Sequence, residues 1–75
     1  MNQNLLSDAY QFGRNAYKNN IESIQQDALF LDFLNGNTLT THETWLLKKQ
    51  WIKAYSDASI EDMNELHARV FDKYL

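Results

Sequence analysis

The chain has 75 residues, no cysteine and a net charge of −3, from seven Lys and Arg against ten Asp and Glu. The lack of cysteine excludes disulfides and thiolate metal sites, on which domains of this size often depend. The acidic balance argues against a general affinity for phosphate backbones. We expect one small globular domain over residues 1–75. A cytoplasmic location is expected because a secreted domain of this size usually carries disulfides, and the first residues do not resemble a signal peptide.

The absence of proline and the presence of only two glycines favour helices over a β fold. We predict an all-α domain of four short helices, at about 5–19, 20–35, 41–57 and 59–75. In the first helix, apolar residues between Leu5 and Tyr17 recur at the spacing of one helical face. Gly13 lies at the edge of that face. A glycine within a helix costs about 1 kcal/mol relative to alanine, so we expect a neighbouring backbone to approach closely there.

The second predicted helix begins with Asn20 as its N-cap and includes residues 28–34, ALFLDFL, of which six are apolar. On a helix these side chains point to all sides and need cover on all sides. The stretch is therefore either a central core helix, or a homodimer seam or docking groove. Gly36, after Asn35, would close the helix in the left-handed conformation. The alternative is an α+β domain with a β-hairpin around Asn35-Gly36, since Asn-Gly is typical of a type I′ turn.

The third predicted helix starts at a capping box, Thr40-Thr41-His42-Glu43, in which the side chains of Thr40 and Glu43 bond each other's backbone amides. Ser59 and Asp62 suggest a similar start for the fourth helix. Apolar residues of the fourth helix fall on one face, which we expect to turn toward the core. These residues are Ile60, Met63, Leu66, Val70, Phe71 and Tyr74.

Residues 44–55, TWLLKKQWIKAY, hold both tryptophans and three lysines. At about 100° per residue, Trp51 lies in the middle of an apolar arc, and we predict that it is a buried anchor. The other residues of this arc are Leu47, Ala54, Tyr55 and Ala58.

A second strip of the same helix lies outside that arc. It contains Trp45 and Ile52, seven residues apart, with Lys49 and Lys53 beside them. One interpretation is a contact surface for an acidic partner or for RNA. The other is that Trp45 packs over a neighbouring helix while the lysines are solvated.

No catalytic arrangement is present in the sequence. The serines lack a glycine elbow and a paired histidine, and Glu61 and Glu65 fit a solvated helix face better than an acid–base pair. A zinc site needs three or four ligands, and only His42 and His67, from different helices, are offered. We therefore expect no enzymatic activity, no cofactor and no metal.

Residues 9–16, AYQFGRNA, match the pattern A-x-x-x-G-x-x-A, and residues 51–58, WIKAYSDA, match W-x-x-G-W-x-x-A with Ala54 and Tyr55 at the glycine and the second tryptophan. Both segments resemble the ribosome modulation factor family. That family is basic and binds ribosomal RNA, whereas this chain is acidic, lacks the family's proline and has a further helix. The resemblance implies a ribosome- or RNA-associated factor as an alternative function.

The main expectation is a small non-enzymatic regulator or inhibitor of the kind that phages and mobile elements encode. It would present an apolar helical surface to a protein partner or to a second copy of itself, without contacting nucleic acid or a membrane. The predicted contact residues are Phe30, Phe33, Leu34, Trp45, Lys49, Ile52 and Lys53. In the alternative, Trp45 stacks on RNA bases while Lys49 and Lys53 contact phosphates.

Overall fold

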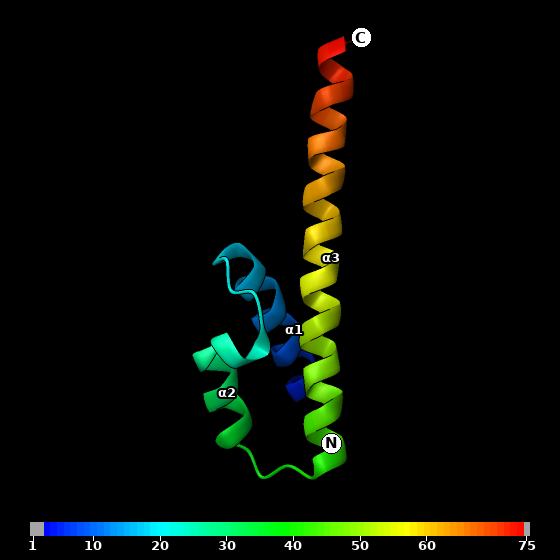
Figure 1. The fold of residues 1–75 in the computed structure, drawn as a ribbon. Helices are drawn as coiled ribbons and strands as arrows, with labels where there is room; N and C mark the ends of the chain where they lie inside the picture. The colour runs from blue at the N-terminus through cyan, green and yellow to red at the C-terminus, as the bar shows by residue number, and fades with distance from the viewer. Residues whose placement is uncertain (1–2, 75) are drawn as a thin grey trace.

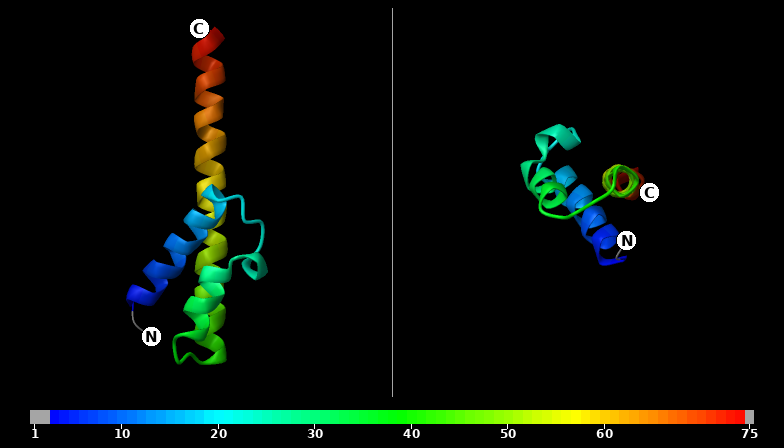
Figure 2. Two further views of the ribbon diagram at one scale, coloured as in Figure 1. Left: turned by 90° about the vertical axis from the view of Figure 1, so that its left-hand side faces the viewer. Right: turned by 90° about the horizontal axis from the view of Figure 1, so that it is seen from below.

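The computed structural model describes the backbone of residues 3–74 and the side chains of residues 3–64. Its elements are α1 (Gln3–Lys18), a 3₁₀ turn η1 (Ile24–Gln26), α2 (Ala28–Asn35) and α3 (Thr41–Tyr74). The long helix α3 is the axis: α1 crosses it obliquely and α2 lies beside its N-terminal part (Figures 1 and 2). The C-terminal turns of α3 extend past both helices, which gives dimensions of 54 × 22 × 15 Å.

The all-α prediction is confirmed, but the described chain has three helices and one 3₁₀ turn instead of four helices. The hairpin alternative is wrong, because Ala28–Asn35 is helical and no strand occurs within residues 3–74. Gly36 follows α2 in the right-handed helical conformation, with φ −77° and ψ −8°. The predicted left-handed position for this glycine is therefore also wrong.

The left-handed residue is Asn20, with φ 60°, and it ends α1 rather than starting a second helix. The backbone amide of Ile21 donates to the Ala16 carbonyl at 2.9 Å, and the amide of Asn20 donates to the Tyr17 carbonyl at 3.2 Å. This pair of bonds is the Schellman pattern, which satisfies carbonyls of the last helical turn. The predicted N-cap at Asn20 is wrong for this reason.

The N-cap of α2 is Asp27, whose carboxylate accepts a hydrogen bond from the backbone amide of Phe30 at 3.1 Å. Before it, Ser23 is extended, with φ −148° and ψ 161°. The predicted helix 20–35 is therefore divided into a loop, η1 and the short α2. An aspartate directly before an apolar run is the expected sequence signal for such a start.

The capping box at the start of α3 is confirmed. The amide of Glu43 donates to the Thr40 hydroxyl and the amide of Thr40 donates to the Glu43 carboxylate, each at 3.1 Å. These bonds hold the pKa of Glu43 below its ordinary value, because they favour the charged carboxylate.

The third and fourth predicted helices are one helix of 34 residues, so the predicted boundary near residue 58 is wrong. No proline or glycine occurs in the sequence after Gly36, and serine and aspartate alone do not end a helix. Asp62, predicted to complete a cap with Ser59, instead accepts the Tyr17 hydroxyl of α1 at 2.8 Å.

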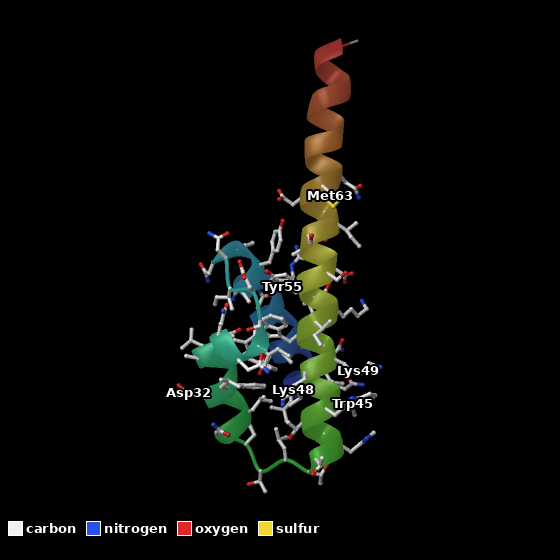
Figure 3. All side chains as sticks on the ribbon, in the orientation of Figure 1. Asp32, Trp45, Lys48, Lys49, Tyr55 and Met63 are labelled. Atoms are coloured by element: carbon white, nitrogen blue, oxygen red, sulfur yellow. The ribbon has the colours of Figure 1, made fainter. Side chains whose placement is uncertain are left out.

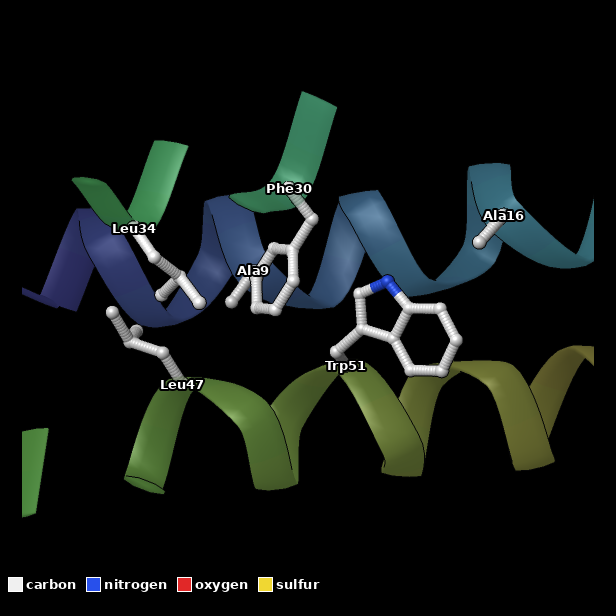
Figure 4. Packing of buried hydrophobic residues seen from close by; sticks show 6 residues of the cluster. All are labelled: Ala9, Ala16, Phe30, Leu34, Leu47 and Trp51. Carbon is white, nitrogen blue, oxygen red and sulfur yellow. The ribbon is translucent and has the colours of Figure 1, made fainter. Parts of the chain in front are cut away.

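The core lies where α1 and α2 meet the inner face of α3, as Figure 4 shows. Trp51 is 3% exposed, and its ring stacks on Tyr55 with centroids 5.1 Å apart. Its indole Nε1–H donates to the buried carboxylate of Asp27 at 2.8 Å, which ties the start of α2 to α3. The predicted anchor is confirmed. The other members of the hydrophobic cluster are Ala9, Ala16, Phe30, Leu34 and Leu47.

Gly13 lies at the crossing of α1 and α3. A Cβ atom at this position would overlap the carbonyl oxygen of Trp51 and would lie 2.8 Å from Cβ of Ala54. The predicted close approach of a neighbouring backbone is confirmed, and it explains why a glycine occupies the middle of α1.

Candidate functional site

One side of α3 is joined to α1 by polar contacts that use the acidic residues of α3. The Tyr10 hydroxyl donates to the Asp57 carboxylate at 2.7 Å, and the Lys53 ammonium lies 3.2 Å from the same oxygen. These two hydrogen bonds hold the pKa of Asp57 below its ordinary value.

The contacts continue one turn further along both helices. The Arg14 guanidinium binds both oxygens of Glu61, at 2.7 and 3.2 Å, which lowers the pKa of Glu61 and raises that of Arg14. The hydrogen bond that Tyr17 donates to Asp62 raises the pKa of the Tyr17 phenol. Among the described side chains beyond the first turn of α3, every acidic residue thus contacts α1.

The opposite face of α3 carries large apolar side chains that no other helix covers. Trp45 is 52% exposed, Ile52 56%, Ile60 52% and Met63 65%. Figure 3 shows Trp45 on the side of α3 that is turned away from α1 and α2. At 100° per residue, these positions form one stripe along the helix. We name it the outer strip, consisting of Trp45, Lys49, Ile52, Ser56, Ile60 and Met63.

The ring of Trp45 is held by residues of its own helix. The Lys49 Nζ atom lies 4.5 Å from the ring centroid, a cation–π geometry. The His42 ring, in the first turn of α3, stacks on the Trp45 ring, with centroids 5.9 Å apart and planes at 24°. More than half of the Trp45 side chain remains exposed, so the interpretation that it packs over a neighbouring helix is wrong.

Ile52 forms a ridge between two shallow grooves. One groove, of about 390 Å³, is lined by Lys49, Ile52, Lys53, Ser56 and Asp57. The other, of about 430 Å³, lies between the segment 22–25 and α3, with Trp51 and Tyr55 in its wall. Because Ile52 lines both grooves, side chains of a partner could pack on either side of it.

Four of the seven predicted contact residues lie together on the exposed part of α3. Trp45, Lys49 and Ile52 belong to the outer strip, and Lys53 lies beside it, with its Nζ atom 5.5 Å from the ring centroid of Tyr10. The spacing of about 100° per residue thus distinguishes the buried face of this helix from its exposed face correctly.

The three predicted contact residues of α2 are not on that surface. Phe30 is fully buried, Leu34 is 8% exposed, and Phe33 packs on the Phe12 ring with centroids 5.1 Å apart. The stretch 28–34 therefore contributes Phe30 and Leu34 to the core, while its role as a homodimer seam or docking groove stays a prediction. Its exposed large side chain is Leu29, at 72%.

Ile60 and Met63 were predicted to face the core and are instead exposed, which corrects the predicted apolar face of a fourth helix. They lie on the outer side of α3, whose inner side at this level contacts α1 through Glu61 and Asp62. The remaining residues of that predicted face, Leu66, Val70, Phe71 and Tyr74, lie outside the described side chains, as does His67. The sequence signal that would have placed Ile60 and Met63 on the exposed face is their seven-residue spacing from Lys53 and Ser56, respectively.

Within the described side chains, no group of three or more His, Asp or Glu residues is placed to hold a metal ion. Among the described helices, none has a stretch apolar and long enough to traverse a bilayer.

Comparison with protein-family models, with curated proteins and with solved structures finds no match to this chain. The proposals that follow rest on the geometry of the chain itself.

Proposed function

We propose that this chain is a non-enzymatic regulator or inhibitor that binds a protein partner through the outer strip of α3. The observation that supports the proposal is the row of four large apolar side chains, each more than half exposed, on the face of α3 opposite the core. Exposed apolar side chains gathered on one face of a soluble protein often mark an interaction site. Isolated exposed residues would need no such explanation.

The composition of the strip agrees with a protein contact. Tryptophan is enriched among the residues that dominate binding energy at protein interfaces, and Trp45 is held in place by Lys49 before a partner arrives. Because the ring and the ammonium are already positioned, less side-chain freedom is lost on binding.

The alternative is a ribosome- or RNA-associated factor, favoured by the same pairing of Trp45 with Lys49. Lys49 and Lys53 would neutralise about two phosphates, which corresponds to a log–log salt slope of about −2. Lys53 is already paired with Asp57. One stacked base on Trp45 would add about 1–3 kcal/mol. Together with a net charge of −3, these contributions favour a protein over RNA as the main partner.

The test is site-specific photo-crosslinking in a lysate of the organism that carries the gene. A benzophenone amino acid replaces Ile52 in one variant and Leu29, exposed on α2, in a matched control. We expect a crosslinked protein at position 52, absent at position 29, that withstands nuclease treatment. Loss of the crosslink after nuclease treatment would support the RNA alternative. No crosslink at position 52, or equal crosslinks at both positions, would overturn the proposal.

A further inference from the structure

The outer strip has the geometry of a helix-pairing seam. Its residues are separated by three or four positions, and the pairs Trp45–Ile52, Lys49–Ser56 and Ser56–Met63 are each seven apart. A seven-residue repeat keeps a stripe on one side of a helix over its whole length, so that a second helix can lie along it. At 1.5 Å per residue, the stripe from Trp45 to Met63 is about 27 Å long. This length corresponds to five turns of a partner helix.

Basic residues flank the first half of this seam on both sides. On the helical wheel, Lys48 lies on one side of the line from Trp45 to Ile52 and Lys53 on the other. Both are exposed, as is Lys49. In paired helices the residues that flank the apolar seam select the partner by charge. The lysines of this chain occupy such flanking positions.

Residues 44–56 contain these three lysines and no acidic residue, and Lys53 is paired with Asp57 one turn further on. The nearest carboxylate after them, Asp57, is held by Tyr10 and Lys53, and Glu61 is held by Arg14. Asp57, Glu61 and Asp62 thus contact α1, whereas Lys48, Lys49 and Lys53 lie in or beside the seam. A chain that is acidic as a whole therefore presents a local basic surface.

We infer that the occupant of this seam is an acidic amphipathic α-helix of another protein, lying along α3 with its apolar residues on Trp45 and Ile52. The inference rests on the proposed function and specifies the chemistry of its partner. Acidic residues flanking the apolar stripe of the partner would face Lys48 on one side, and on the other side they would share the exposed Lys53 with Asp57. Two copies of this chain paired in register through residues 44–56 would place lysines against lysines, which disfavours a homodimer through this part of the strip.

The experiment titrates the full chain with three helical peptides of equal length. The first has leucine at the seam positions and glutamate at the flanking positions. The second has lysine in place of every glutamate, and the third has the composition of the first in shuffled order. Binding is measured by calorimetry and by Trp fluorescence. We expect the first peptide to bind at least tenfold more tightly than either of the others.

Two variants and their controls assign this binding to the seam. Ile52→Asp should weaken binding of the first peptide at least tenfold, whereas Leu29→Asp, the same change at an exposed position on α2, should leave it unchanged. The variant Lys48→Glu/Lys49→Glu/Lys53→Glu should reverse the preference toward the lysine peptide, whereas Lys18→Glu on α1 should not. Circular dichroism verifies that each variant retains its helices.

Three results would overturn the inference: equal binding of the glutamate and lysine peptides, binding of the shuffled peptide, or binding of single-stranded RNA without any peptide.

Different results would contradict the proposed function. If the crosslink at position 52 withstands nuclease but is unchanged in the triple glutamate variant, the inference about charge is wrong while the protein-binding proposal stands. If no crosslink forms at position 52, the proposed function itself is wrong.

Discussion

Trp51 and Trp45 lie six residues apart on α3 and have opposite environments. Trp51 is 3% exposed and donates a hydrogen bond to a buried carboxylate, whereas Trp45 is 52% exposed and contacts His42 and Lys49 of its own helix. The same residue type thus serves the fold on one face of α3 and is exposed to solvent on the other. Position on the helix, rather than hydrophobicity, decides the role of each side chain.

The largest expected difference between the two faces is in stability. Removal of a buried aromatic side chain typically costs about 3–5 kcal/mol, which is a large part of the stability of a small domain. Trp51→Ala should therefore unfold or nearly unfold the chain, while Trp45→Ala should change the free energy of unfolding by less than about 0.5 kcal/mol. Urea titration followed by circular dichroism measures both values. Equal losses would show that the faces are wrongly assigned.

A smaller effect is expected from the carboxylate beneath Trp51. Asp27→Ala removes the acceptor of both the Phe30 amide and the Trp51 indole. Loss of an N-cap costs about 1 kcal/mol, and an unsatisfied buried donor costs about 1–3 kcal/mol. Thermal melting should show this loss. The control is Asp32→Ala, which removes an exposed carboxylate from the same helix. An Asp32→Ala loss as large as that of Asp27→Ala would contradict the linking role of Asp27.

The third prediction compares alanine substitutions of the two glycines, Gly13 at the helix crossing and Gly36 after α2. Gly13→Ala places a methyl group against the Trp51 carbonyl, and such overpacking costs about 1–3 kcal/mol. At Gly36 the same change brings a Cβ 3.2 Å from the Asp32 carbonyl oxygen, a tight contact but a longer one than at Gly13, and φ is already in the range of ordinary residues, so any loss should be smaller. Denaturant midpoints compare the two. A Gly13→Ala variant that is more stable than the wild type would refute the close crossing.

The smallest expected effects are those of pH on the exposed contacts between α1 and α3. The pKa values of Asp57 and Glu61 are lowered in the folded chain, so their contribution to stability is present above their unfolded values near pH 4 and is lost as the pH falls through the folded values. Tyr17 has a raised pKa, so its contribution is present below about pH 10 and is lost at higher pH.

Melting temperatures across this pH range test these signs. Arg14→Gln should reduce the loss of stability on the acid side, and Tyr17→Phe should reduce the loss on the alkaline side. The effects should be small because all of these groups are exposed to solvent. An acid-side loss that is identical in the wild type and in Arg14→Gln would argue against a role of the Arg14–Glu61 pair.

Local sequence patterns predicted the features that depend on neighbouring residues alone. The capping box at Thr40 and Glu43 and the arc around Trp51 follow from spacing along one helix. The close approach at Gly13 followed from the energetic cost of a glycine in a helix, although its partner on α3 could not be named.

The features that were not predicted involve contacts between distant segments and, at Asp27, a local helix-start signal that was missed. Ser59 and Asp62 resemble a helix start, but Asp62 accepts a hydrogen bond from Tyr17 of α1, 45 residues away, and α3 continues. The predicted helix 20–35 includes the loop from Asn20 to Asp27, which turns α2 onto α1 and α3, and without that turn the stretch 28–34 has too few neighbours to cover it. Correct assignment of that loop would have removed Phe30 and Leu34 from the candidate surface.

We propose that the inner face of α3 holds the fold and that its exposed outer face binds a partner. Acrylamide quenching of two single-tryptophan variants, Trp45→Phe and Trp51→Phe, tests it most directly, once circular dichroism shows that both are folded. In Trp45→Phe the remaining Trp51 should be shielded and should emit at short wavelength, while in Trp51→Phe the remaining Trp45 should be quenched readily. Equal quenching of the two residues, or stronger quenching of Trp51, would contradict the account.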